Sequence, residues 1–183
     1  MTDRETYKVA VAGVTRDLPL FEVAPGVRIA VFNLLGDSEI VAAAARELAK
    51  QLKPLSPDAL VTAETKSVPL VYQLEVEMDK PWVVLRKAYK SYMGETVTAE
   101  TVSITTGAPQ TLYLDEKDQN FVRGKRVILV DDVVSTGSTF AGMREVMDKA
   151  GAEVVAEAAV FTEGEDDKWR DVCALGHLPV FTS

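Results

Sequence analysis

The sequence predicts an α/β protein in which helices flank a mostly parallel sheet. Residues 127–130 are β-branched or aliphatic without alternation, which suits a strand buried on both faces of such a sheet. Residues 59–62 and 154–161 predict two further strands. A helix is predicted at 68–78, after the strand at 59–62, and another at 138–149, after the strand at 127–130. Strands that alternate with helices in this way are typical of parallel sheets.

Length and composition limit the class of protein. At 183 residues the chain is expected to form one domain, residues 1–183, with a single core. Its net charge of −8 argues against nucleic acid or an anionic membrane as a partner. The N-terminus has no apolar segment long enough for a signal or a membrane span, and the only cysteine, Cys173, excludes an intrachain disulfide. We therefore expect a soluble, cytoplasmic protein.

The N-terminal part is expected to form a small hood beside the sheet, from about residues 1–36. Residues 6–14 and 28–32 predict strands, and prolines and a glycine between them predict a turn-rich connection. Asp37 or Ser38 then caps a helix that ends near Lys53, before a proline.

Two loops in the middle of the chain carry charge. Residues 63–67 form a turn between a predicted strand and a predicted helix, with an acid and a lysine in it. Residues 86–96 follow the strand at 81–85 and contain four charged residues, three of them basic. In an acidic chain this cluster suits a polyanion such as pyrophosphate, although an exposed tip that only aids solubility would have the same composition.

The next residues predict an antiparallel hairpin. Its strands are residues 97–104 and 110–114, and 115–120 read as a polar link to the central strand. Beyond the helix at 138–149, Gly151 is a natural C-cap.

The predicted strand at 127–130 leads into the most informative loop. Asp131 and Asp132 stand where that strand is expected to end, and the carboxyl ends of strands are where ligands bind in open α/β sheets. Hydroxyl side chains around a glycine follow, at the start of a helix, which is a site for phosphate. These residues are Ser135, Thr136, Gly137, Ser138 and Thr139. A sugar phosphate would suit both parts of this loop. The two acids would contact the sugar hydroxyls and a hydrated cation, and the backbone amides would bind the phosphoryl group. The alternative is an ordinary turn with Ser138 as a helix N-cap.

Residues 130–139, Val-Asp-Asp-Val-Val-Ser-Thr-Gly-Ser-Thr, resemble the phosphoribosyl-pyrophosphate motif of type I phosphoribosyltransferases. Residues 63–67 are similar to the pyrophosphate loop of adenine phosphoribosyltransferases, with lysine and serine in place of the family's arginine and glycine. Residues 86–96 resemble their mobile active-site loop, which begins with Arg-Lys and ends in Gly-Glu-Thr. Pro25-Gly26-Val27 resembles the start of their hood, but the Phe-Arg-Asp-Ile that follows in the family is Ile-Ala-Val-Phe here, residues 29–32. The resemblance covers about residues 25–163 and implies the type I phosphoribosyltransferase (Rossmann-like) fold.

The resemblance also implies an activity and roles for the residues. The activity is transfer of a ribose phosphate from phosphoribosyl pyrophosphate to a purine base, with adenine expected first, Mg²⁺ as cofactor and a homodimer as the assembly. Asp131 and Asp132 would hold the ribose hydroxyls directly or through Mg²⁺, the 135–139 loop would anchor the 5-phosphate, and Glu95 would assist proton movement at the base. The residues of the two charged loops are expected to contact the pyrophosphate: Glu64, Lys66, Ser67, Arg86, Lys87 and Lys90. Ile29 is expected to contact the base.

Two alternatives stay open. The changed hood leaves hypoxanthine, xanthine or another base as the acceptor. The same fold also serves in purine-responsive regulators that bind phosphoribosyl pyrophosphate without turnover. Those regulators carry a DNA-binding segment ahead of the module, and only some 25 residues precede the hood here, which favours the enzyme.

The C-terminal part carries less information. Residues 163–167 form an acidic stretch that we expect to be a solvated turn. The tail, 168–183, is expected to add to the hood. It contains the only histidine, His177, which we expect in a packed terminal strand, with a base-pocket or dimer-contact role as the alternative.

Overall fold

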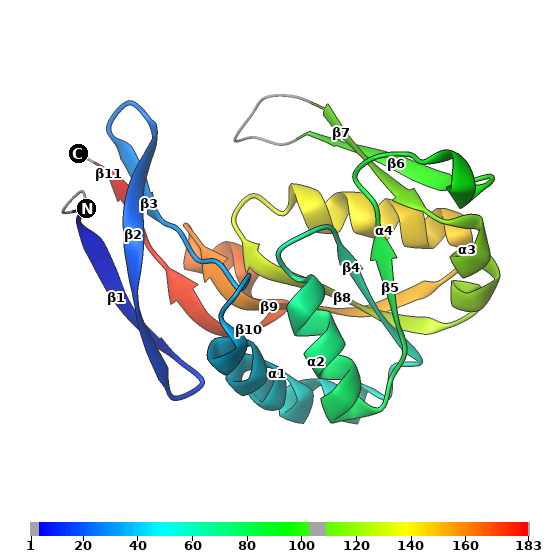
Figure 1. Cartoon of the computed structure of the whole chain (residues 1–183), viewed down its shortest axis with the longest axis horizontal. Coiled ribbons are helices and arrows are strands. Elements are labelled where there is room, and N and C mark those ends of the chain that lie inside the picture. The colour runs from blue at the N-terminus through cyan, green and yellow to red at the C-terminus, as the bar shows by residue number, and fades with distance from the viewer. Residues whose placement is uncertain (1–3, 103–108, 183) are drawn as a thin grey trace.

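The computed structural model describes residues 4–102 and 109–182. Its centre is a five-stranded sheet in the order β10-β9-β8-β4-β5, in which all neighbouring strands run parallel (Figure 1). These strands are β4 (Ala59–Ala63), β5 (Trp82–Leu85), β8 (Arg126–Val134), β9 (Glu153–Glu163) and β10 (Val172–Leu178). The predicted parallel α/β architecture is confirmed.

Helices cover both faces of this sheet (Figure 1). The helices α1 (Ser38–Leu52) and α2 (Val68–Met78) pack on one face, and α4 (Ser138–Ala150) packs on the other. The Asp37 carboxylate accepts the Ile40 N–H at 3.2 Å and so caps α1, as its sequence predicts.

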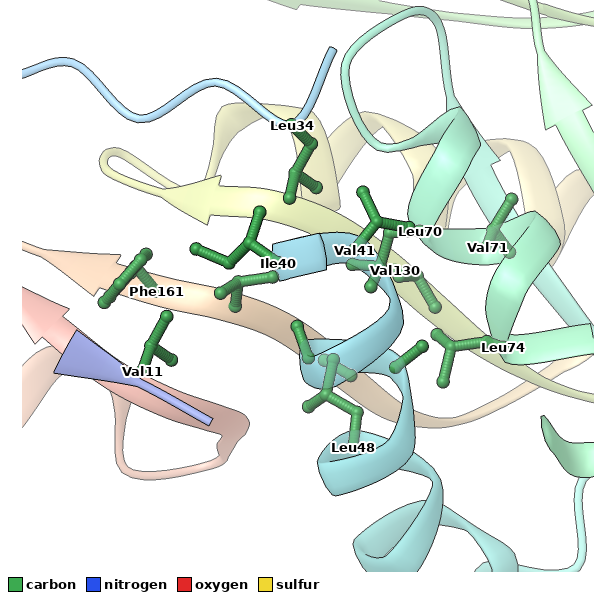
Figure 2. Close-up of a cluster of buried hydrophobic side chains, with 14 of the residues drawn as sticks. Val11, Leu34, Ile40, Val41, Leu48, Leu70, Val71, Leu74, Val130 and Phe161 are labelled. Atoms are coloured by element: carbon green, nitrogen blue, oxygen red, sulfur yellow. The ribbon is translucent and has the colours of Figure 1, made fainter. Parts of the chain in front are cut away.

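The larger hydrophobic core lies between the sheet and the helices α1 and α2. Figure 2 shows Leu48 of α1 and Leu74 of α2 turned toward Val130 of β8, with Phe161 of β9 in the same cluster. Each of these side chains is fully buried, which contributes about 1.5–3 kcal/mol apiece relative to exposure. This core fixes the strand that carries the two acids.

A second sheet forms the hood, in the order β1-β2-β3-β11 (Figure 1). Its strands are β1 (Thr6–Val11), β2 (Val14–Ala24), β3 (Val27–Ala30) and β11 (Val180–Thr182). The turn-rich connection expected between the first two predicted strands is wrong, because residues 14–24 form β2. Ala12 and Gly13 have positive φ angles of 52° and 80°, which is the geometry of a two-residue hairpin turn, so the chain reverses there and pairs with itself.

The hood is joined to the central sheet by packing and charge. Phe32, which follows β3, meets Phe161 edge to face at 4.8 Å between ring centroids. Arg16 of β2 donates to the Asp37 carboxylate at 2.7 Å. The hood therefore contacts both β9 and the start of α1.

The hairpin after β5 is as predicted, whereas the connection that follows it is not. The hairpin of β6 (Val97–Val102) and β7 (Pro109–Leu114) is confirmed, and the predicted strand end and turn at residues 103–108 lie outside the described residues. The polar link after it is wrong, since α3 (Glu116–Val122) forms there. Its apolar residues Phe121 and Val122 pack on the core between α4 and the sheet.

The central strand is longer than its apolar run predicts. It continues through both acids to Val134, because Val133 and Val134 still pair with Phe161 and Thr162 of β9. Within the described ranges, no helix combines the length and the apolar character that a membrane crossing requires.

Candidate functional site

A cleft of about 480 Å³ opens at the carboxyl ends of β4 and β8, beside the N-terminus of α4. Three loops that are far apart in the sequence meet in it. The lining consists of residues 64–67, Lys87, Thr101, Gln110 and residues 131–140. Of the residues predicted to bind substrate, it gathers Glu64, Lys66, Ser67, Lys87, the two acids and the whole 135–139 loop.

The 135–139 loop presents backbone donors to the cleft. Gly137 precedes α4 with φ 80°, a left-handed conformation that only glycine adopts without strain. Thr136 Oγ1 accepts the Ser138 N–H at 3.3 Å and lies 3.0 Å from Ser138 Oγ. As in any helix, the amides of the first turn have no partner within α4, and the helix dipole adds positive potential there. This end of the helix suits a phosphoryl group.

The two acids differ in their surroundings. Asp132 is only 9% exposed, whereas Asp131 is partly open to the cleft. Burial raises the pKa of Asp131 well above its usual range, and the adjacent carboxylate adds to this shift, while Lys87 opposes it. A cation or a ribose hydroxyl at Asp131 would relieve this unfavourable charge.

A buried hydrogen-bond network ties the 64–67 loop to the central strand. Thr62 Oγ1 donates to the Val130 carbonyl at 2.8 Å and lies 2.7 Å from Ser67 Oγ. Ser67 Oγ in turn donates to the Ala63 carbonyl at 3.2 Å. The Ser67 side chain is thus engaged in hydrogen bonds inside the protein, although Ser67 belongs to the lining of the cleft. No local sequence pattern indicates this role of Thr62, because Val130 is 68 residues away in the chain.

Glu64 joins the 64–67 loop to the basic loop. Its carboxylate forms an ion pair with Arg86 and accepts the Lys87 N–H at 3.0 Å. Arg86 is therefore not among the residues that line the cleft, whereas the exposed Lys66 and Lys87 do line it.

Besides Arg86, three predicted site residues do not line the cleft. The Glu95 N–H donates to Glu116 at 3.1 Å and its carbonyl accepts from Gln119, so Glu95 lies against α3. Lys90 is exposed and does not line the cleft. Ile29 is in β3, opposite Phe21 and Val180 in register.

The first residue of the acidic stretch at 163–167, Glu163, is buried at the end of a strand and is not part of a solvated turn. Glu163 ends β9 and is only 5% exposed, and its carboxylate accepts a hydrogen bond of 2.5 Å from Ser135 Oγ. The prediction is wrong for this residue because β9 runs parallel to β8 and brings Glu163 to the level of the loop after β8.

His177 belongs to a strand, as expected, and to no part of the cleft. It is in β10, where Nδ1 lies 2.9 Å from Thr162 Oγ1 and Nε2 lies 3.0 Å from the Gly164 carbonyl.

The donor set fits a magnesium ion held mainly by substrate. Across residues 4–102 and 109–182, no group of three or more His, Cys, Asp or Glu side chains gathers as a metal cage. Mg²⁺ takes one or two carboxylates together with phosphate oxygens and water, and Asp131 and Asp132 supply carboxylates at the cleft.

An all-parallel sheet with an acid pair and the N-terminus of a helix at its carboxyl end is the arrangement found in α/β proteins that bind phosphorylated ligands. Residues 34–175 match the family model of the phosphoribosyl transferase domain. Since this match spans well over half of the chain, the chain belongs to the phosphoribosyltransferase domain family, and the predicted family is confirmed.

Individual relatives agree with the family. A hypoxanthine/guanine phosphoribosyltransferase of Methanotorris igneus is 36% identical over 111 residues, which cover 61% of this chain and 57% of the relative. The purine biosynthesis transcriptional repressor PurR of Bacillus subtilis is 27% identical over 150 residues, 81% of this chain and 52% of the repressor. The chain thus spans little more than half the length of these two relatives.

The fold is shared with solved structures of the same family. Adenine phosphoribosyltransferase from Thermoanaerobacter pseudethanolicus has a TM-score of 0.67 at 19% identity, with 94% of this chain and 95% of that chain covered. The type I phosphoribosyltransferase fold predicted from the sequence is confirmed.

Proposed function

We propose that the chain is a purine phosphoribosyltransferase, which joins a purine base to the ribose of phosphoribosyl pyrophosphate and releases pyrophosphate. The observation that carries this proposal is the cleft itself. It places a phosphate loop, an acid pair and two lysines around one volume large enough for a phosphorylated sugar. Membership in the family supports the same activity.

The 5-phosphate is assigned to the 135–139 loop. The free amides at the start of α4 donate to its oxygens, and Gly137 lets the backbone turn tightly around them. The ribose hydroxyls then lie toward Asp131 and Asp132 at the end of β8. Their negative charge stabilises the positive charge that develops on the ribose as pyrophosphate departs.

The pyrophosphate is assigned to the opposite wall of the cleft. Lys66 and Lys87 are exposed there and supply positive charge to the departing polyanion. Arg86 acts through Glu64, since their ion pair holds the two loops together. Mg²⁺, when bound between the acids and the substrate oxygens, would neutralise further charge on the leaving group.

Glu95 and Lys90 are proposed to act only after the segment at 88–96 moves toward the cleft. In the present conformation the Glu95 backbone is bonded to α3, at Glu116 and Gln119. These contacts are exposed, so breaking them costs little. Movement of the segment would exclude water, which competes with the base for the ribose, and would bring Glu95 to the base for proton transfer.

The base is assigned to the side of the hood, with Ile29 as an apolar contact. Adenine is the first expectation, in line with the adenine phosphoribosyltransferase resemblance of the loops. The Methanotorris relative is named for hypoxanthine and guanine, and its identity of 36% supports these as competing acceptors.

The test is release of pyrophosphate from phosphoribosyl pyrophosphate with Mg²⁺, run separately with adenine, hypoxanthine, guanine, xanthine, uracil and orotate. We expect release with one or two purines and none with pyrimidines. A double variant, Asp131→Asn with Asp132→Asn, should keep the fold and lose binding of phosphoribosyl pyrophosphate. The matched control changes two exposed acids outside the cleft, Asp148→Asn with Asp171→Asn, and should bind normally. Unchanged binding by the first double variant contradicts the proposed site.

A regulatory module that binds phosphoribosyl pyrophosphate without turnover is the second candidate. It is favoured by the likeness to the Bacillus subtilis repressor, which extends over 81% of this chain. Binding of phosphoribosyl pyrophosphate at the acid pair, together with no pyrophosphate release for any base, would select this candidate over the enzyme.

We also propose a homodimer. The outward face of α2 carries Tyr72 and Val76, one turn apart, at 56% and 61% exposure. Such a stripe on an otherwise packed helix suits a contact with a second copy. Sedimentation of the purified chain should give twice the monomer mass, and Tyr72→Glu should shift it toward the monomer.

A further inference from the structure

One short segment touches three successive residues of the 135–139 loop. This segment, residues 163–169, is named the acidic segment here, and it joins the end of β9 to the 3₁₀ helix η3 (Asp166–Trp169). It contacts the loop at Ser135, Thr136 and Gly137. Of its residues whose side chains the structure describes, none lines the substrate cleft. These residues therefore contact the loop from outside the cleft.

The first contact is a buried carboxylate. Glu163 is 5% exposed, and its Oε2 accepts from Ser135 Oγ at 2.5 Å. Hydrogen bonds to a charged acceptor are about twice as strong as those between neutral groups. The single proton of the Ser135 hydroxyl is directed at Glu163, so this hydroxyl does not donate to a phosphoryl group, and the donors of the loop to such a group are its backbone amides. The carboxylate is thus a fixed anchor for the first residue after β8.

The second contact is an aromatic ring on the glycine. The Trp169 ring lies so close to Gly137 that a Cβ at that position would be 3.0 Å from the ring. The indole N–H of Trp169 donates to the Glu163 carbonyl at 2.9 Å, which fixes the ring relative to the first anchor. Gly137 has φ 80°, and the ring limits the freedom that a glycine otherwise has there.

The third contact comes from Lys168, which precedes Trp169 in the chain. Lys168 Nζ donates to the Thr136 carbonyl at 3.3 Å and lies 4.7 Å from the centre of the Trp169 ring. Lys168 is exposed, so this contact is the weakest of the three.

We propose that Glu163 and Trp169 are positioning residues, which hold the 135–139 loop in the shape that binds a phosphoryl group. A loop of small residues around a glycine loses conformational entropy when it closes on a ligand, and a loop that is already held loses less. The affinity of the loop for a sugar phosphate therefore depends on contacts made behind it. The inference deepens the proposed function, since it concerns the same loop, but its main test needs no turnover.

The test measures binding of ribose 5-phosphate by titration calorimetry, without any base. Glu163→Ala removes the anchor and should weaken binding about tenfold, the scale of one hydrogen bond to a charged group. Glu163→Gln keeps an acceptor oxygen for Ser135 and should restore most of that loss. Glu165→Gln makes the same chemical change at an exposed position of the segment with no loop contact, and should bind like the unchanged chain. Trp169→Ala should weaken binding as Glu163→Ala does.

Several outcomes decide the proposal. It is overturned if Glu163→Ala binds ribose 5-phosphate as tightly as the unchanged chain, or if Glu163→Gln loses as much as Glu163→Ala. If Glu163→Ala does not fold, Trp169→Ala decides in the same way. Where a base is turned over, the variants should raise KM for phosphoribosyl pyrophosphate and leave KM for the base unchanged, which a general loss of structure would not do. If the unchanged chain binds ribose 5-phosphate but turns over no base, the proposed enzyme activity is contradicted. The binding titrations of the variants then still decide the positioning role.

Discussion

Thr62→Val isolates the buried network that joins two loops of the cleft. Valine has nearly the same shape as threonine and replaces the hydroxyl with a methyl group. In the structure the Thr62 hydroxyl is fully buried, donates to the Val130 carbonyl at 2.8 Å and meets Ser67 Oγ at 2.7 Å. The substitution therefore removes the hydrogen bond to Val130 and the polar contact with Ser67 Oγ, and it opens no cavity.

The size of the effect follows from the partners that remain. The Ser67 hydroxyl can still donate to the Ala63 carbonyl, 3.2 Å away, so it does not become unsatisfied. The Val130 carbonyl keeps its place in the parallel sheet. The loss is then that of one to two hydrogen bonds, less a gain from burying a methyl group, and we expect about 1–2 kcal/mol.

The assay is urea unfolding followed by circular dichroism, with the melting temperature as a second measure. For a chain of this size the expected loss corresponds to a drop in Tm of roughly 2 to 8 °C. Thr6→Val, at an exposed position of β1, makes the same chemical change without a buried bond and should stay within about 0.5 kcal/mol. If Thr62→Val is as stable as Thr6→Val, the network contributes nothing and the reasoning is refuted.

Two further predictions concern the cleft. Burial raises the pKa of Asp131, so the folded state gains stability from its proton at low pH and loses that gain as pH rises through the raised pKa. Without divalent cations, Asp131→Asn should therefore become increasingly more stable than the unchanged chain as pH rises from 4 to 8, whereas Asp148→Asn should show no such trend. Gly137→Ala places a Cβ at φ 80° against the Trp169 ring, and Gly124→Ala places one at φ 70° with nothing within 4 Å. Both should cost about 1–2 kcal/mol of stability, and only Gly137→Ala should also weaken ribose 5-phosphate binding; equal binding by both variants would contradict the role of the ring contact.

The elements that carry a strong local pattern were predictable. The helix at 68–78 and the helix that begins at Ser138 have apolar residues at helical spacing, and both occur as predicted. The central apolar run formed a buried strand for the same reason. β2 was missed because its pairing with β1 and β3 overrides the turn-forming Pro19 in its sequence. The α3 helix was missed because only two of its residues are apolar enough to pack.

By itself, the sequence determined the family, the loops that line the cleft and most of the strands and helices, because each of these depends on residues that are close together in the chain. The tertiary structure decided which loop residues are free for a ligand. Thr62 meets Val130 across 68 residues, and Ser135 meets Glu163 across 28. Arg86 is held by Glu64, and Glu95 by α3. The first three of these pairings arise from the parallel order of strands in the sheet, and the fourth from the packing of α3 beside the loop at Glu95. No local pattern of residues encodes contacts between such distant segments.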